Sequence, residues 1–284
     1  MHLPQVWSAK LSPDGRWIAF EWYHRHPNLD VFLVPADGSA APVALTDTPE
    51  MTTLASWLPD SSGVIVAEDH DRDENASLYR VDLARPGEML RLTEDRPPFF
   101  LRGGYLSPDG RYLYYTANYD FAAQRKLEPS WVYRHDLQTG DRTPIAFPKD
   151  PVWGQFSVNR QGTHILYSRS DIHPSGFQVY LVDTEGKNDR ELFNVGDEAK
   201  VFARWFPDGE HILAIAEGTE RGPQNYTSLG VYDLKTESMR WLVDDPARNI
   251  EDAWVSPDGL VVVREVVDAV CRPSYIDPQT GEET

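Results

Sequence analysis

The sequence predicts an all-β protein built from repeated four-stranded units, and two observations support this fold class. A short phrase, Ser-Pro-Asp-Gly, occurs at residues 12–15, 107–110 and 256–259, with degenerate copies at 58–60, 157–162 and 206–209. Aligned on the proline, or on Val158 where the proline is replaced, the copies recur every 46 to 50 residues. The second observation is that a short apolar, β-prone run follows each copy. A fixed period of this size indicates repeated architecture.

Each copy of the phrase is expected to form a tight turn between two strands. Proline pre-sets φ, aspartate bonds to nearby backbone, and glycine accepts a positive φ. We therefore interpret the phrase as a structural turn and not as part of an active site.

The apolar runs are predicted to be strands because they are short, rich in β-branched and aromatic residues, and bounded by Gly and Pro. Second strands of the units are expected at 17–20, 64–67, 112–115, 164–167, 212–215 and 261–263. Third strands, after loops of varied length, are expected at 31–34, 78–82, 131–136, 179–183, 229–233 and 274–277. Fourth, shorter strands are expected at 43–46, 89–93, 144–147, 191–193 and 240–243.

Six such units describe a β-propeller, whose four-stranded blades bury their faces by packing on one another around a channel. We expect one domain over residues 1–284, with the first strand of each blade innermost and the six turns on one common face. The blades are predicted at approximately 5–50, 51–97, 98–149, 150–197, 198–247 and 248–284. The sixth blade lacks a fourth strand, so it is incomplete. The ring is either closed imperfectly or part of a longer chain, such as one with seven blades.

Charge and composition argue against two classes of partner. The 27 Lys and Arg residues against 45 Asp and Glu give a net charge of −18, which repels nucleic acid and anionic lipid surfaces. No apolar run approaches the ~20 residues of a membrane span, and the first residues do not resemble a signal peptide. The single Cys271 cannot form an internal disulfide. We therefore expect no nucleic-acid or membrane partner and a cytoplasmic location.

Motifs for metal binding and catalysis are incomplete. Residues 69–75 start like a calcium loop, but Glu74 stands where that loop needs glycine and Arg80 where it needs glutamate. No histidine pair has the helical spacing of a zinc site, although a ring could bring distant histidines together at its axis. The Gly-x-Ser-x-Gly nucleophile motif is absent, and Cys271 is interpreted as a small apolar strand-edge residue. We expect no metal, no cofactor and no catalytic residue in this chain.

The links between second and third strands are the predicted binding surface. They are long and varied, at 23–28, 69–75, 118–128, 170–175 and 217–224, whereas the links on the other face are short. Binding residues concentrate on variable loops held by a rigid scaffold. The candidate contacts to another domain or partner are Arg72, Asp73, Glu74, Tyr119, Phe121 and Arg125.

The repeats resemble two groups of known propellers. Trp/Leu-Ser-Pro-Asp-Gly-Arg-x-Ile/Leu-x-Phe/Tyr, followed by Leu-Tyr-x-Val-Asp, is similar to TolB-like proteins and to the N-terminal propeller of the prolyl oligopeptidase family of serine peptidases. The acidic stretch at 71–82 favours the second group, because its acylaminoacyl-peptidase-like members often carry such a stretch. The resemblance covers essentially the whole chain.

This resemblance implies a function that depends on a further domain. In the peptidase family, an α/β-hydrolase domain follows the propeller and holds the Ser, Asp and His triad, while the propeller filters substrates by size. No triad residue can be transferred to this sequence, because the domain with those motifs is not in it. Family propellers commonly have seven blades, whereas this sequence has six.

Three functions are consistent with the sequence. The first is the gating and docking domain of a serine peptidase that acts on short peptides, with the hydrolase domain of the same polypeptide as its partner. The second is a free-standing TolB-like scaffold that binds a partner protein on one face. The third, a propeller lyase or sugar-binding enzyme, would need a histidine cluster and a basic cleft that the sequence does not show.

Overall fold

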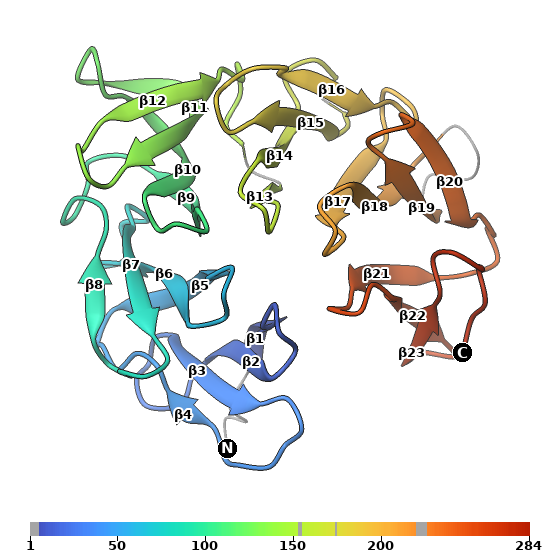
Figure 1. Cartoon of the computed structure of the whole chain (residues 1–284), viewed down its shortest axis with the longest axis horizontal. Helices are drawn as coiled ribbons and strands as arrows, with labels where there is room; N and C mark the ends of the chain where they lie inside the picture. Colours follow the sequence, from blue (N-terminus) through green and yellow to red (C-terminus); the bar gives the residue numbers. More distant parts are fainter. Residues whose placement is uncertain (1–5, 153–154, 174, 220–225) are drawn as a thin grey trace. The chain divides into compact units, whose positions relative to one another are not determined.

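The computed structural model describes residues 6–152, 155–173, 175–219 and 226–284, and every regular element within these ranges is a β-strand (Figure 1). No helix of the described part is long and apolar enough to cross a membrane. The chain divides into two compact units, residues 1–147 and 148–284. Each unit contains three antiparallel sheets, whose strands follow one another in chain order.

The sheets of the first unit are the first three blades. Blade one contains β1 (Val6–Leu11), β2 (Trp17–Trp22), β3 (Asp30–Pro35) and β4 (Val43–Ala44). Blade two contains β5 (Met51–Trp57), β6 (Gly63–Asp69), β7 (Ser77–Asp82) and β8 (Met89–Arg91). Blade three contains β9 (Leu101–Leu106), β10 (Tyr112–Asp120), β11 (Arg125–Asp136) and β12 (Arg142–Ala146).

The sheets of the second unit are the last three blades. Blade four contains β13 (Phe156–Val158), β14 (His164–Arg169), β15 (Gln178–Asp183) and β16 (Arg190–Phe193). Blade five contains β17 (Lys200–Trp205), β18 (His211–Glu217), β19 (Thr227–Asp233) and β20 (Ser238–Val243). Blade six contains β21 (Ile250–Val255), β22 (Val261–Val267) and β23 (Val270–Ile276).

These sheets confirm the predicted fold class, an all-β propeller of six blades with an incomplete sixth blade. Each sheet lies within one of the six predicted blade ranges. The sixth sheet has three strands, although Glu283 near the chain end forms an antiparallel bridge with Ile276 of β23. The prediction that residues 1–284 are one domain stays a prediction.

The hydrophobic cores lie between neighbouring blades. In β6, Val64 and Val66 pack against blade one, whereas the intervening Ile65 packs against blade three. In β18, Ile212 and Leu213 face blades four and six in the same way. Successive side chains of a strand point to opposite faces, so a strand with both faces covered is apolar at every position. This explains the uninterrupted apolar runs of the second strands.

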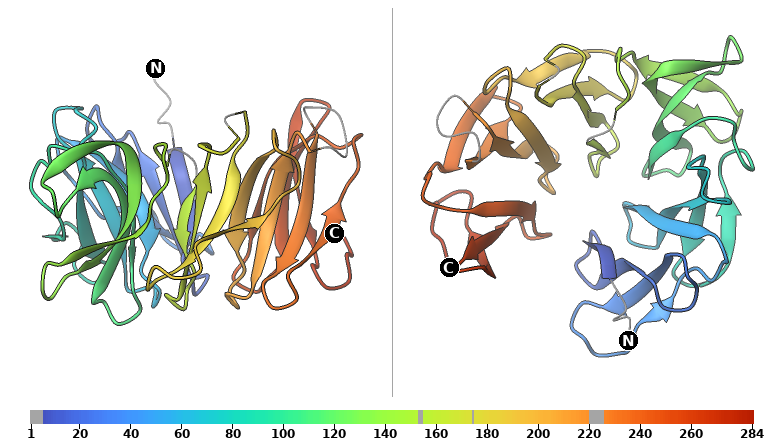
Figure 2. Two further views of the ribbon diagram at one scale, coloured as in Figure 1. Left: turned by 90° about the horizontal axis from the view of Figure 1, so that it is seen from above. Right: turned by 180° about the vertical axis from the view of Figure 1, so that it is seen from behind.

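First strands of neighbouring blades contact one another within each unit, as β5 does with β9 and β17 with β21 (Figure 2). Between blades one and two, Lys10 Nζ donates to the carbonyl of Ala55 at 2.7 Å, and Trp57 Nε1 donates to the carbonyl of Lys10 at 2.9 Å. Between blades two and three, Ser56 Oγ donates to the carbonyl of Gly104 at 2.6 Å. Polar bonds therefore fix the first strands, while hydrophobic packing joins the rest of each blade pair.

The Ser-Pro-Asp-Gly phrase forms the predicted turn, and its serine holds the turn together. Ser107 Oγ donates to Asp109 Oδ1 at 2.5 Å and accepts the Tyr112 N–H at 2.8 Å. Gly110 donates its N–H to the carbonyl of Ser107 at 2.8 Å with a φ of +72°, a conformation that glycine adopts without steric cost. The turns at 12–15 and 256–259 contain the same serine and glycine bonds.

One turn was aligned incorrectly from the sequence. In blade four, Asn159 makes the backbone bonds that Ser107 makes in blade three, to His164 and Gly162. Arg160 therefore stands in the place of the proline, and Val158 is the last residue of β13. The alignment on Val158 was wrong by two residues, because the asparagine side chain accepts the backbone N–H groups that serine accepts elsewhere.

Two strand boundaries also differ from the prediction. The expected loop at 118–128 is a β-hairpin, since β10 and β11 continue to pair as far as Asp120 and Arg125 after a bulge. The third strand of blade six begins at Val270 and not at 274, because Asp268 and Ala269 both adopt a positive φ and form a two-residue turn. Parts of the expected loops at 170–175 and 217–224 lie outside the described residues.

Replacing Ser107 by alanine is expected to destabilise the protein by about 1–2 kcal/mol, because the Tyr112 N–H loses its acceptor at a buried turn. The midpoint of urea unfolding, followed by tryptophan fluorescence, measures this loss. Ser238→Ala, at an exposed hydroxyl of β20, is the control and is expected to change stability by less than about 0.5 kcal/mol. Equal midpoints for the two variants would contradict the role of Ser107.

Candidate functional site

In the predicted binding surface of the first unit, hydrogen bonds join the loops of blades one and two, and ring contacts join the hairpin of blade three. We call it the loop end of unit 1, and it consists of residues 23–28, 70–75, 94–100 and 119–125. Arg72 in the β6–β7 link donates to Asn28 Oδ1 in the β2–β3 link at 2.7 Å. Arg96, between blades two and three, donates to Asp71 Oδ2 at 3.2 Å. The links of blades one and two and the connection to blade three thus contact one another.

The β6–β7 link presents the first three candidate residues in an unusual backbone conformation. Arg72 and Glu74 both have a positive φ, as does Asp71. The buried Asp69 holds this conformation, since its Oδ1 accepts the N–H of Glu74 at 3.2 Å, and burial raises the pKa of its carboxyl. The loop geometry therefore depends on a fixed carboxylate beneath it.

The acidic residues of this link bond to neighbours within the loop end. Asp73 Oδ1 accepts the N–H of Asn75 at 2.9 Å, and this bond lowers the pKa of the Asp73 carboxyl. Asp71 pairs with Arg96, as described above, and Asp69 bonds to Glu74. The Asp69 and Asp73 side chains also hydrogen-bond to each other, so of the three alternate aspartates only Asp71 pairs with a described residue of another loop. Arg72, Asp73 and Glu74 are exposed.

The other three candidate residues come from the hairpin of blade three. Tyr119 and Phe121 are half-buried in an aromatic cluster and do not protrude. The Tyr119 ring stacks on the buried Phe99 at 4.7 Å, and Phe121 meets the Tyr133 ring edge-on at 5.0 Å. Only Arg125 is freely accessible, with a side chain that is 67% exposed and lies 3.8 Å from Asp120.

Phe121 differs from Arg125 because its ring is packed against other side chains. Phe121 also contacts Phe99 at 5.2 Å, and the Arg142 guanidinium lies 4.4 Å from its ring centroid. A ring with contacts on three sides contributes to the packing of blade three and is not free for a partner. Arg72, Asp73, Glu74 and Arg125 are the accessible members of the candidate interface, and the interface itself stays a prediction.

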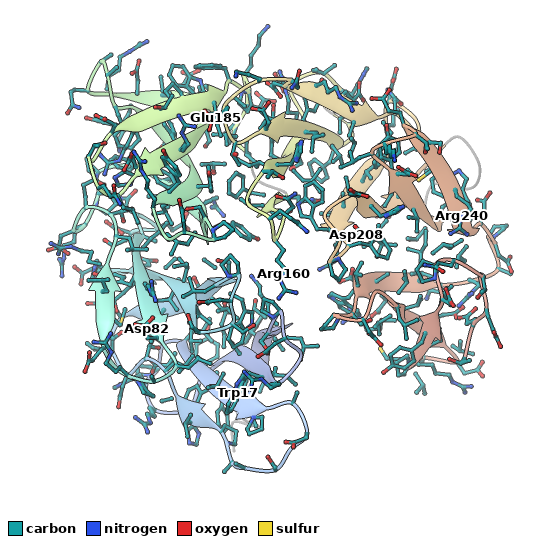
Figure 3. The ribbon with its side chains drawn as sticks, in the orientation of Figure 1. Trp17, Asp82, Arg160, Glu185, Asp208 and Arg240 are labelled. Carbon is teal, nitrogen blue, oxygen red and sulfur yellow. The ribbon has the colours of Figure 1, made fainter. Side chains whose placement is uncertain are left out.

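A cavity of about 510 Å³ lies in the second unit, at the end of blades five and six that carries the Pro-Asp-Gly turns. We call this the turn end of the blades. Figure 3 marks two of its lining residues, Asp208 at the β17–β18 turn and Arg240 on β20. Asp258 and Asp277 add two further carboxylates. His211 Nδ1 lies 2.7 Å from Asp208 Oδ2. The sequence did not predict this cavity, because its walls come from two blades and from turns interpreted as purely structural.

Sequence reasoning also missed a group of three side chains in blade one. Within the described residues, His26, Asp30 and Asp47 are the group of His, Cys, Asp and Glu side chains that could hold a metal ion. The search considered only pairs of histidines, whereas this group combines His26 and Asp30, four residues apart, with Asp47, which the pairing of β3 with β4 brings close. A search for His and Asp residues at paired strand ends would have found them.

Replacing Phe121 by alanine is expected to destabilise the protein by about 2 kcal/mol, since a half-buried ring loses its contacts to Phe99 and Tyr133. Arg125→Ala, at a neighbouring exposed position with a long ion pair, is expected to cost less than about 0.5 kcal/mol. Urea unfolding of both variants measures the difference. A neutral Phe121→Ala would mean that its ring is free for a partner.

Known proteins resemble this chain over most of its length, although no protein-family model matches it. The chain is 21% identical over 203 residues to the dual function macrocyclase-peptidase POPB of Amanita bisporigera, a match that spans 62% of this chain and 27% of that protein. The chain therefore covers about a quarter of the length of this curated relative.

Solved structures with the same fold include a peptidase, a lyase and a TolB protein. The β-propeller domain of the Trilobed protease from Pyrococcus furiosus has a TM-score of 0.65 and 15% identity, with 100% of this chain and 84% of that chain covered. An oligogalacturonate lyase in complex with manganese has a TM-score of 0.71 and 16% identity, covering 96% and 74%. TolB from Acinetobacter baumannii has a TM-score of 0.61 and 16% identity, covering 98% and 62%.

These likenesses confirm the fold, and the sequence match to the peptidase supports the predicted resemblance. The chain is a β-propeller that is similar in sequence to a prolyl oligopeptidase-family enzyme and in structure to peptidase, lyase and TolB propellers.

Proposed function

We propose that this chain is the non-catalytic propeller domain of a prolyl oligopeptidase-family serine peptidase. In this role it docks an α/β-hydrolase domain of the same polypeptide and limits the size of the peptides that reach the catalytic site. The observation that carries the proposal is the match of 203 residues to a macrocyclase-peptidase, on a chain with the propeller fold. The predicted cytoplasmic location belongs to the same proposal.

The loop end of unit 1 is the surface that we assign to docking. Its exposed charges are held in place by hydrogen bonds between loops, such as Arg72 to Asn28 and Arg96 to Asp71. Such a surface needs little ordering on binding, which reduces the entropic cost of an interface. Its mixture of cationic and anionic groups suits a polar contact between two domains that must separate to admit a substrate.

The coding sequence that follows Thr284 tests the proposal directly. We expect a Gly-x-Ser-x-Gly motif about one domain further on, within a pattern of alternating strands and helices. A stop codon after Thr284 would contradict the peptidase and leave the TolB-like scaffold as the function of the chain.

The isolated chain is expected to show no reaction with a serine-directed phosphonate probe, because it contains no Gly-x-Ser-x-Gly motif. The full-length protein is expected to be labelled at one serine beyond Thr284, and intact-mass spectrometry identifies the labelled part. Stoichiometric labelling of the isolated chain would show that the propeller carries its own nucleophile.

Charge reversal of Arg72 and Arg125 tests the docking surface. In the full-length protein, Arg72→Glu and Arg125→Glu are expected to lower kcat/KM for a peptide substrate about five- to tenfold, because exposed interface charges are placed against like charges. Arg16→Glu is the matched control, since Arg16 lies beside a turn with its side chain 76% exposed. Loss of activity only in the Arg16 variant would place the docking surface at the turn end.

A further inference from the structure

We propose that His26, Asp30 and Asp47 of blade one bind a divalent first-row transition-metal ion such as Zn²⁺ or Mn²⁺. One ligand atom from each of the three residues lies within 4.8 Å of the others. His26 Nε2 is 2.8 Å from Asp47 Oδ1 and 4.0 Å from Asp30 Oδ2. Neighbouring ligands of a tetrahedral ion with bonds of ~2.1 Å are separated by roughly 3.4 Å. Small side-chain movements are therefore sufficient for all three to reach one ion.

Asp30 provides the strongest indication of a ligand. Its side chain is fully buried at the start of β3. Its Oδ1 accepts hydrogen bonds from the Thr46 hydroxyl at 3.0 Å and from the Thr48 N–H at 3.2 Å. Its Oδ2 is buried, has no hydrogen-bond partner among the residues that the structure describes, and points into the cluster. A buried carboxylate oxygen without a partner is costly, and a cation between the three residues would satisfy it.

The other blades show that the propeller fold does not require an acid at this position. The residue before the apolar run of the third strand is Asp30 in blade one, whereas the corresponding residues in blades two to five are Ser77, Trp131, Gln178 and Ser228. The neighbouring threonine, in contrast, recurs with a structural role. Thr46 Oγ1 accepts the N–H of Val31 at 2.9 Å, and Thr93 Oγ1 accepts the N–H of Leu78 in blade two at 2.8 Å. Blades one and two thus share the threonine bond, whereas the buried acid at this position occurs in blade one and not in blades two to five.

Residues outside the cluster contact Asp47 and the link that carries His26. The two carboxylate oxygens of Asp47 have different neighbours, since Oδ2 accepts a hydrogen bond from Arg25 while Oδ1 faces His26. Outer contacts such as that of Arg25 orient metal ligands. On the link that carries His26, the His24 ring stacks on Trp22 at 4.0 Å.

The ligand set and its exposure indicate which ions fit. An imidazole with two carboxylates suits Zn²⁺ and Mn²⁺ better than Ca²⁺, which prefers six to eight oxygen ligands. The side chains of His26 and Asp47 are 30% and 49% exposed, so an ion can enter from solvent and keep water in its remaining positions.

Titration of the untagged chain with ZnCl₂, followed by isothermal calorimetry, tests the site. The wild type is expected to bind one ion. His26→Gln and Asp30→Asn are each expected to weaken binding at least tenfold, and the same variants are expected to weaken the binding of Mn²⁺. Because Asp30 is buried, the half-exposed His26 keeps the test valid if Asp30→Asn does not fold.

Two control variants locate the ion. His173 is also 30% exposed and lies 3.4 Å from one carboxylate, Asp197, so His173→Gln is expected to bind zinc as the wild type does. Cys271→Ser removes the exposed thiol and is likewise expected to have no effect. No binding by the wild type at millimolar zinc, wild-type affinity in His26→Gln, or a loss of binding in either control would overturn the site.

Discussion

Burial of sheet faces between neighbouring blades, on both sides of the middle blade of each unit, is the constraint on which the structure depends. A single blade with four strands leaves two apolar faces exposed, and the alternation of Val64, Ile65 and Val66 shows that each face has a different neighbour. The sheets are therefore stable only when several blades pack side by side. This is why the period of the sequence, and not any individual residue, predicts the architecture.

The remaining polar groups fix the ends of the blades. At one end, a serine or asparagine side chain closes the first turn of blades one, three, four and six, as Ser107 and Asn159 do. At the other end, the links between second and third strands differ in length and sequence, and in unit 1 they bond to one another through pairs such as Arg72 and Asn28. The turn end is thus constrained by folding, whereas the loop end can vary and carry a binding surface.

The cluster in blade one illustrates how a repeated scaffold can acquire a site. The threonine bond to the backbone next to Asp30 also occurs in blade two, where Thr93 makes it and Ser77 stands in place of Asp30. A buried carboxylate can be tolerated here because Thr46 and Thr48 satisfy one of its oxygens. The second oxygen lacks a hydrogen-bond partner within the described part of the chain, so a cation bound here would compensate a buried and unsatisfied carboxylate oxygen.

The sequence by itself determined the strand content, the six-blade repeat and the incomplete sixth blade, because turn chemistry and short apolar runs are local properties that recur along the chain. It also located the variable links, including that of Arg72, Asp73 and Glu74. Only the tertiary structure decided that Tyr119 and Phe121 pack into blade three, since the β10–β11 hairpin continues beyond its expected end. Only the tertiary structure joined His26, Asp30 and Asp47. The positions of such side chains depend on strand pairing between distant residues, which residue spacing along the chain does not encode.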